Sequence, residues 1–192
     1  MKSKSKITIV IAILLVLQMG YPVLVPQISV FGEDVLGTTK VLLDTNMGNI
    51  VIELRDDMPI TSGNFKNLVE QGVYDNTIFH RVIDGFVIQG GDPTGTGYGD
   101  PSIPNISDEF SENAENNKND KGTIAMANTE APNSGSSQFF INLKYNSHLD
   151  NLHPVFGEVI EGMDVVDQIG KVATAGDKPL QDVTIITAQM VD

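Results

Sequence analysis

The stretch Phe79-His80-Arg81-Val82-Ile83-Asp84-Gly85-Phe86-Val87-Ile88-Gln89-Gly90-Gly91-Asp92 decides the fold and the site of this chain. Two runs rich in β-branched and aromatic residues flank Asp84-Gly85, a dipeptide that favours the tight turn of a β-hairpin. Arg81 lies in the first run and Gln89 in the second, so the hairpin carries a guanidinium and a carboxamide on neighbouring strands. Such polar groups among apolar ones suit a surface that grips a peptide. A plain hairpin whose Arg81 is a solvated surface charge fits the same spacing.

Alternation of side chains across a strand predicts how the two runs divide between the faces of the hairpin. Phe79, Arg81 and Ile83 are expected to share one face of the first run. Val87 and Gln89 are expected to share a face of the second run. The resulting mixture of apolar, cationic and amide side chains fits a binding surface better than a plain core, where polar groups are costly to bury.

Composition excludes several classes of protein. The chain has 192 residues, which suffices for one domain with a sizeable core and an appendage. It has no cysteine, which excludes disulfides, thiolate metal sites and a cysteine nucleophile. The formal net charge of −13 repels phosphate backbones, so a nucleic-acid partner is not expected.

The first part of the chain differs in character from the rest. Three lysines in residues 1–6 precede a largely apolar segment over residues 7–25. A basic start before an apolar segment is typical of a secretory signal peptide or of a single membrane anchor, and both interpretations stay open. We therefore expect residues 1–33 to be a signal or anchor with a linker. Residues 34–192 are expected to form a domain outside the cytoplasm, either secreted or anchored to the membrane.

The remaining chain alternates short apolar runs with turn residues, a pattern typical of a mainly β domain. Strands are expected at 40–44, 49–54, on both sides of Asp84-Gly85, and at 122–127, 138–143, 155–160 and 183–190. Helices are expected over 59–71 and where Met163, Val166 and Ile169 recur at helical spacing. Eight strands can close into a barrel filled by side chains, with helices at the open ends. A filled barrel places any binding site on its outer surface.

Other polar clusters are weaker signals. The glycines of residues 91–121 do not match the dinucleotide fingerprint, and no regular βαβ unit surrounds them, so we expect a surface loop. His148 and His153 lack a third convincing ligand, so no metal site is expected. His80 follows the opposite face from Arg81 and is expected to be a core histidine with its hydrogen bonds satisfied.

Four separated blocks carry a resemblance to a known family. They are Phe79–Asp92, Gly122–Asn128, Gly135–Ile141 and Leu149–Gly157, and they keep that family's order and approximate spacing. Over roughly residues 40–190 the chain resembles the cyclophilin family of peptidyl-prolyl cis-trans isomerases. The resemblance implies a closed eight-stranded antiparallel β-barrel capped by two α-helices.

The resemblance also implies which residues form the active site. Positions that resemble the family's catalytic ones hold Arg81, Phe86, Gln89, Asn128, Phe140 and His153. Positions that resemble its substrate-binding ones hold Val87, Ala127, Gln138, His148 and Leu149. Two positions depart from the family's pattern. Val87 replaces a common methionine, and His148 stands where many eukaryotic members have tryptophan, which puts tight cyclosporin binding in doubt.

Without the resemblance, alternation leaves the orientation of one strand open. Gln138 and Phe140 share one face of the run 138–143, and Phe139 and Ile141 share the other. Either Phe139 packs in the core while Phe140 lies outside beside Arg81, or the two phenylalanines exchange places.

The implied activity is isomerisation of Xaa-Pro peptide bonds, which requires no cofactor, no metal and no covalent step. The implied partners are proline-containing peptides and unfolded protein clients, and the protein is expected to act as a monomer in folding outside the cytoplasm. The alternative is a catalytically silent module that binds proline peptides on the same barrel. Arg81 favours the enzyme, because a pure binder has no special need for a donor at the prolyl nitrogen.

Overall fold

The computed structural model describes residues 38–192, and the expectations for residues 1–33 fall outside that part of the chain. Within the described residues, no helix combines the length and the apolar character needed to cross a bilayer. The described chain forms one large β-sheet, a small ladder and two α-helices.

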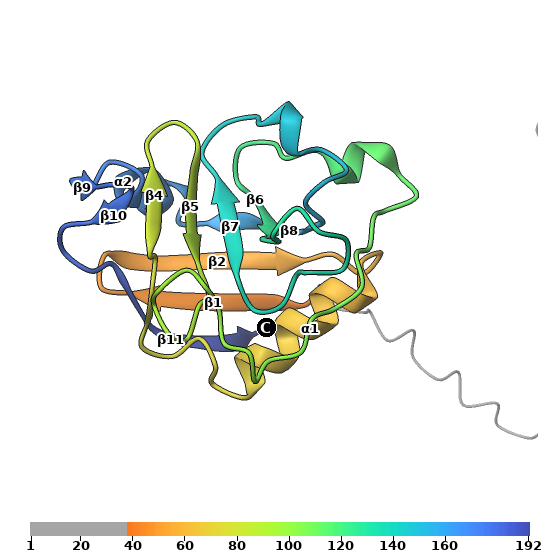
Figure 1. The fold of residues 1–192 in the computed structure, drawn as a ribbon, viewed down its shortest axis with the longest axis horizontal. Coiled ribbons are helices and arrows are strands. Elements are labelled where there is room, and N and C mark those ends of the chain that lie inside the picture. Colours follow the sequence, from red (N-terminus) through yellow and green to blue (C-terminus); the bar gives the residue numbers. More distant parts are fainter. Residues whose placement is uncertain (1–37) are drawn as a thin grey trace, which may run out of the picture. The chain divides into compact units, whose positions relative to one another are not determined.

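A curled nine-stranded sheet dominates the structure (Figure 1). Its strands are β1 (Lys40–Thr45), β2 (Gly48–Leu54), β3 (Thr77–Ile78), β4 (Arg81–Ile83), β5 (Val87–Gly90), β6 (Thr123–Met126), β7 (Phe139–Asn142), β8 (Val155–Glu161) and β11 (Thr184–Val191). Their order is β3-β11-β1-β2-β8-β6-β7-β5-β4, with antiparallel pairing throughout. Strand β1 pairs with β11, so that Lys40 lies opposite Val191. A separate ladder joins β9 (Thr174–Ala175) to β10 (Lys178–Pro179).

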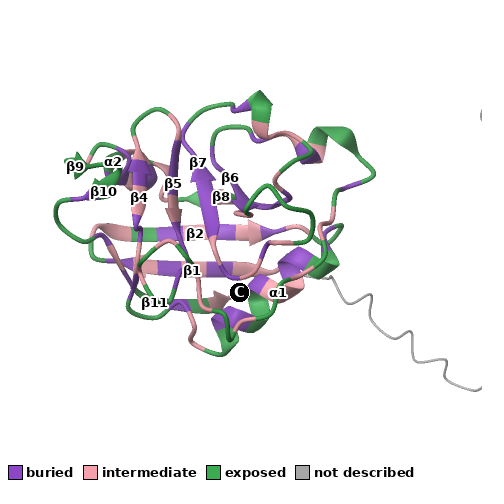
Figure 2. Cartoon of the chain, viewed as in Figure 1, coloured by how far each residue is buried: buried purple, intermediate pink, exposed green. Residues whose placement is uncertain are grey.

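The core lies inside the curl of the sheet. In Figure 1, β4, β5 and β7 run across β1 and β2. Alternate side chains from both parts meet in one buried cluster, which includes Val41 and Ile52 on one side and Ile88 and Ile141 on the other. Figure 2 shows buried positions along these strands and exposed positions mainly in the connecting loops. Because the interior is filled by side chains, a ligand has to bind outside it.

Helices complete the fold at the positions expected from the sequence. Helix α1 spans Pro59–Glu70, α2 spans Met163–Ile169, and two short 3-10 helices span Ala114–Asn117 and Ser147–Leu149. Proline at the start of α1 costs no hydrogen bond, because the first N–H groups of a helix have no partner within the helix. Helix α1 packs against β8 and β11. Its Phe65 ring lies between 5.0 and 5.5 Å, measured between ring centroids, from Tyr74, Phe139 and Phe156.

The strand count and the closure of the barrel differ from the expectation. All eight expected strands are present, but β3, β9 and β10 are additional. Each of these three has two residues, which is too short for alternation to show in the sequence. The end strands β3 and β4 are not joined by a ladder within residues 38–192, so the sheet forms a curled half-barrel rather than the closed barrel expected. A single bridge between Ile78 and Asp92 links β3 to the segment after β5.

The hairpin at Asp84-Gly85 is confirmed, with Arg81 opposite Gln89. The prediction that Phe79 shares a face with Arg81 is wrong. Strand β3 ends at Ile78 and β4 begins at Arg81, and the break between them turns Phe79 into the core, where it is fully buried. Regular alternation therefore applies only from Arg81 onward.

The same break changes the environment of His80. This residue is buried, but it lines the same hollow as Arg81 instead of facing the opposite side. Its Nδ1 has no hydrogen-bond partner among the described residues. The prediction of a core histidine with satisfied hydrogen bonds is therefore wrong.

Candidate active site

Strand register aligns five residues across the outer face of the sheet. Arg81 lies opposite Gln89, and Gln89 lies opposite Phe140. Phe140 in turn lies opposite Ala125, and Ala125 opposite Val155. Directly opposed residues point to the same face of a sheet, so these five side chains form one row across β4, β5, β7, β6 and β8.

An apolar cluster covers the middle of this row. Its buried members are Val87, Ala125, Phe140 and Val155, and the partly buried side chains packed against them are Phe86, Ala127 and Leu149. Phe139 instead lies fully buried in the main core, beside Phe65. The sequence left open which face of strand β7 packs in the core. In the structure Phe139 packs in the core and Phe140 lies on the outer face. The row and this cluster together are called the outer site below.

Arg81 stands at one end of the outer site and is held on two sides. Its Nη1 donates a hydrogen bond to Oε1 of Gln89 at 3.3 Å, and its Nε lies 3.5 Å from Oδ2 of Asp177. Its Cζ lies 6.0 Å from the centroid of the Phe86 ring, which is within the range of a cation–π contact. The Arg81 side chain is 41% exposed, so its remaining N–H groups can reach a bound ligand.

A chain of hydrogen bonds connects Arg81 to a buried carboxylate. Gln89 accepts from Arg81 and donates through Nε2 to Oε1 of Gln138 at 3.0 Å. Gln138 donates through its own Nε2 to the carbonyl of Gly97 at 3.0 Å, and the Gly97 N–H donates to Asp92 at 2.6 Å. Each amide thus uses one oxygen and one nitrogen, which fixes the orientation of both glutamines.

Asp92 organises the glycine-rich loop that follows β5. Its carboxylate is fully buried and accepts main-chain N–H bonds from Thr94, Thr96, Gly97 and Gly99. Burial raises the pKa of Asp92, but hydrogen bonds from Thr94, Gly99 and Gly97 together outweigh burial, so the net pKa is lowered. The glycines of this loop adopt positive φ, which explains their recurrence. The loop expected to be only a surface feature therefore forms a wall of the site.

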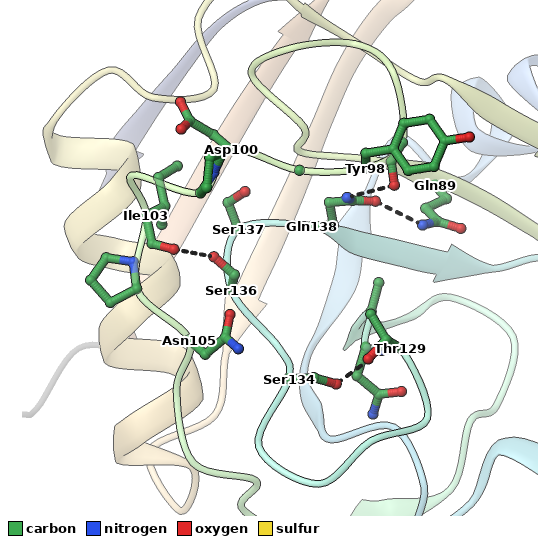
Figure 3. A pocket seen from close by; sticks show the side chains of 16 residues that line it. Gln89, Tyr98, Asp100, Ile103, Asn105, Thr129, Ser134, Ser136, Ser137 and Gln138 are labelled. Carbon is green, nitrogen blue, oxygen red and sulfur yellow. Dashed lines mark hydrogen bonds between the residues drawn. The ribbon is translucent and has the colours of Figure 1, made fainter.

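A hollow of about 680 Å³ opens beside Gln138 (Figure 3). It is lined by Gln89, Ala127 and Gln138 from the sheet side, and by residues 97–101, 103–105, 128–129, 134 and 136–137 from two loops. The sequence alone does not mark these loop residues as part of a site. Their glycine and serine content was the available signal, and that content is equally typical of plain loops.

Two histidines and one asparagine complete the set expected from the sequence. The His148 ring stacks on Phe86, with 5.6 Å between centroids, and the His153 ring meets the Phe140 ring edge-on at 5.3 Å. Asn128 lines the hollow beside Gln138, but its amide donates to the Leu152 carbonyl and accepts from the Glu130 N–H. The structure thus brings all eleven expected residues to one contiguous surface, with the Asn128 amide turned into its own loop.

Stability is expected to fall as the pH drops below 6.5, because the buried His80 and the partly buried His153 resist protonation. Burial is the largest cause that lowers the pKa of both His80 and His153 below the ordinary value of 6.5. The unfolded chain therefore binds more protons than the folded protein below pH 6.5, and the stability present above that pH is lost as the pH falls through the lowered values. Each histidine contributes a slope of at most about 1.4 kcal/mol per pH unit.

Urea unfolding between pH 7.5 and pH 5 measures this slope. The variant His153→Gln is expected to flatten the slope, whereas His148→Gln at the exposed ring is the matched control and is expected to retain it. An unchanged slope in His153→Gln contradicts the assignment of the effect to that ring.

The fold and the outer site place an apolar floor, with a cation at its end, on the outside of a filled half-barrel. The sequence profile described as "Cyclophilin type peptidyl-prolyl cis-trans isomerase/CLD" matches residues 40–190. The chain belongs to this family of cyclophilin-type peptidyl-prolyl cis-trans isomerases, and its activity is that of a peptidyl-prolyl isomerase.

Individual relatives agree with this assignment. Peptidyl-prolyl cis-trans isomerase-like 1 of Gibberella zeae is 42% identical over 159 residues, which cover 81% of this chain and 96% of that protein. A peptidyl-prolyl cis-trans isomerase of Schizosaccharomyces pombe is 44% identical over 153 residues, which cover 78% and 97%. The crystal structure of a Cryptosporidium parvum cyclophilin-type isomerase, obtained in the presence of the dipeptide Ala-Pro, is similar with a TM-score of 0.74 and 33% identity. That similarity covers 80% of this chain and 99% of that one.

Proposed function

We propose that this isomerase rotates Xaa-Pro bonds at the outer site, with Arg81 as the principal catalytic residue, and that it assists the folding of client proteins outside the cytoplasm. The observation that carries the assignment of the site is the row from Arg81 through Gln89 to Phe140, which places a fixed cation beside a buried aromatic floor. The similar Cryptosporidium structure was obtained with a proline dipeptide, which supports proline peptides as ligands.

The chemistry needed is rotation about one amide bond. Resonance in the planar amide gives a barrier of about 18–20 kcal/mol. In the twisted state the prolyl nitrogen loses conjugation and gains a basic lone pair, so a hydrogen-bond donor aimed at it stabilises that state more than either planar form. Arg81 suits this role, because its guanidinium is always charged and keeps N–H donors beyond those used by Gln89 and Asp177.

Magnitudes show that Arg81 needs the rest of the outer site. A rate gain of about a million-fold corresponds to about 8 kcal/mol, and one charge-assisted hydrogen bond contributes roughly 1.5–3 kcal/mol. The remainder has to come from holding the proline ring on Phe140, Phe86 and Leu149 while the peptide backbone is bound beside it. The Asn128 amide is bonded within its own loop, and the Gln89 amide is bonded to Arg81 and Gln138. We therefore assign that backbone contact to the main chain of residue 128 and to the second N–H of the Gln89 amide.

Export rests on the sequence. The lysines at positions 2, 4 and 6 precede the apolar residues 7–25, which is typical of a segment that directs the following domain across a membrane. We also propose that the protein acts as a monomer.

One experiment tests both parts of this proposal. Alkaline phosphatase, which is active outside the bacterial cytoplasm, is fused after residue 192 of the full chain. High phosphatase activity, lost when residues 2–25 are deleted, supports export, and equal activity in both fusions contradicts it. The membrane and external fractions are then assayed for acceleration of proline-limited refolding of a client. Binding of a proline peptide without acceleration would indicate the silent binding module instead.

A further inference from the structure

Asp177 contacts Arg81 at a different nitrogen from the one that donates to Gln89. Its Oδ2 lies 3.5 Å from Nε of Arg81, and its side chain is 50% exposed. The two residues line a second hollow, of about 590 Å³, that adjoins the outer site at Gln89. The mechanism described above assigns no role to Asp177.

The backbone, rather than a long side chain, fixes the position of this carboxylate. Ala175 pairs with Lys178, so Gly176 and Asp177 form the two-residue turn between β9 and β10. Both turn residues have positive φ, at 56° and 67°, as in the type I′ turns that favour glycine, asparagine and aspartate. A short aspartate side chain on such a turn has little freedom to move away from Arg81.

The turn is also fastened to the strand that carries Arg81. The carbonyl of Asp177 accepts a hydrogen bond from the N–H of Val82 at 2.7 Å, directly after Arg81 in β4. The main-chain oxygen of Asp177 therefore contacts Val82, and its side-chain oxygen contacts Arg81, the preceding residue of β4. This arrangement ties the backbone of Asp177 to the strand that carries the guanidinium.

The consequence for Arg81 is geometric. A guanidinium has five N–H donors in a rigid planar fork. Asp177 faces Nε and Gln89 binds Nη1, so among the described residues neither partner uses Nη2, and its N–H groups are left for the ligand. A long side chain that is ordered before the substrate binds loses less freedom in the transition state.

We propose that Asp177 is a positioning residue for this isomerase: together with Gln89 it holds the guanidinium of Arg81 in the orientation that offers the Nη2 N–H groups to the prolyl nitrogen. This inference rests on the proposed role of Arg81. Asp177 itself does not touch the substrate, so its contribution lies in the rate of exchange on the enzyme and not in the affinity for the peptide.

The test is a double-mutant cycle in the full chain. Asp177→Asn keeps a residue that tolerates positive φ and keeps the carbonyl that binds Val82, but it removes the charge that faces Nε. We expect exchange of a saturating Xaa-Pro peptide, measured by NMR, to slow about two- to fivefold, as for loss of a partly exposed ion pair, with an unchanged peptide Kd. In the Arg81→Ala background the same substitution is expected to have no effect.

Two further readouts separate positioning from a general effect. The Nε–H signal of Arg81 is expected to shift and to exchange faster with water in Asp177→Asn, and added salt should slow the wild type toward the variant. Asp182→Asn removes the same charge from the same connection between α2 and β11 without a contact to Arg81, and is expected to match the wild type.

Faster exchange in Asp177→Asn would overturn the inference, because it would mean that the carboxylate competes with the substrate for Arg81. Equal slowing with and without Arg81 would also overturn it, since the effect would then be structural. If the wild type shows no isomerisation at this site, the proposed function fails, and the Nε–H signal still reports whether Asp177 holds the guanidinium.

Discussion

Replacing Arg81 with alanine is expected to slow catalysed exchange of an Xaa-Pro peptide by about 10- to 150-fold and to leave the fold intact. The rate effect follows from losing a charge-assisted hydrogen bond worth about 1.5–3 kcal/mol in the twisted state. The fold is expected to survive because the Arg81 side chain is 41% exposed and its partner Gln89 keeps its bond to Gln138. NMR exchange spectroscopy on a proline peptide measures the rate, and urea unfolding measures the stability.

The matched control is another arginine. Arg55 donates to the carbonyl of Asn116, away from the outer site, so Arg55→Ala is expected to retain the wild-type exchange rate. Arg81→Lys keeps a positive charge but not the planar fork, and is expected to fall between the wild type and Arg81→Ala. Equal exchange in Arg81→Ala and in the wild type would leave an isomerase whose catalysis does not depend on this side chain.

Asp92→Ala is expected to have the largest effect on stability, because each buried N–H left without an acceptor costs about 1–3 kcal/mol, and activity is expected to be lost as well. The substitution leaves four loop N–H groups, which now bind the buried carboxylate, without their acceptor. Activity is expected to fall as well, because the loop carbonyl of Gly97 anchors Gln138, which in turn orients Gln89. Because the pKa of Asp92 is lowered in the folded protein, its contribution is present above the ordinary value of 3.8 and is lost as the pH falls below it.

Urea unfolding of Asp92→Ala beside Asp100→Ala tests this expectation. Asp100 lies in the same loop but is partly exposed, and its carboxylate accepts from the Ser102 N–H. We expect little change in stability for Asp100→Ala. If the free energy of unfolding changes by a similarly small amount in both variants, the expectation is wrong, and water can replace the Asp92 carboxylate as the acceptor without loss of stability.

The sequence carried enough signal for the elements whose pattern is regular. The strands 40–44, 49–54 and 138–143 and the helix at Pro59 follow directly from alternation and from helix-start chemistry, and the structure has them within one or two residues. Alternation also paired Phe140 with Gln138, but it could not decide which face of that strand is the core. The core choice depends on the Phe65 ring of α1, which is remote in sequence.

Contacts remote in sequence account for what the residues alone could not predict. Arg81 and Asp177 are in contact because the turn that contains Asp177 is hydrogen-bonded to β4. No local sequence pattern predicts this contact. Asp92 is different, since its partners follow within seven residues. An aspartate followed by threonines and glycines also occurs in plain loops. The role of Asp92 could not be predicted because it depends on burial of the carboxylate, which only the fold reveals.

The pairing of β1 with β11 has a consequence for engineering. Because Lys40 and Val191 are opposite each other on neighbouring strands, the two ends of the isomerase domain leave the fold at the same place. A domain with adjacent ends can be inserted as a single unit into a surface loop of another protein, or reconnected end to end and opened elsewhere. New termini should not be placed in the exposed Asp84-Gly85 turn, because that turn joins the strands of Arg81 and Gln89. Exposed turns away from the outer site are better positions for new termini.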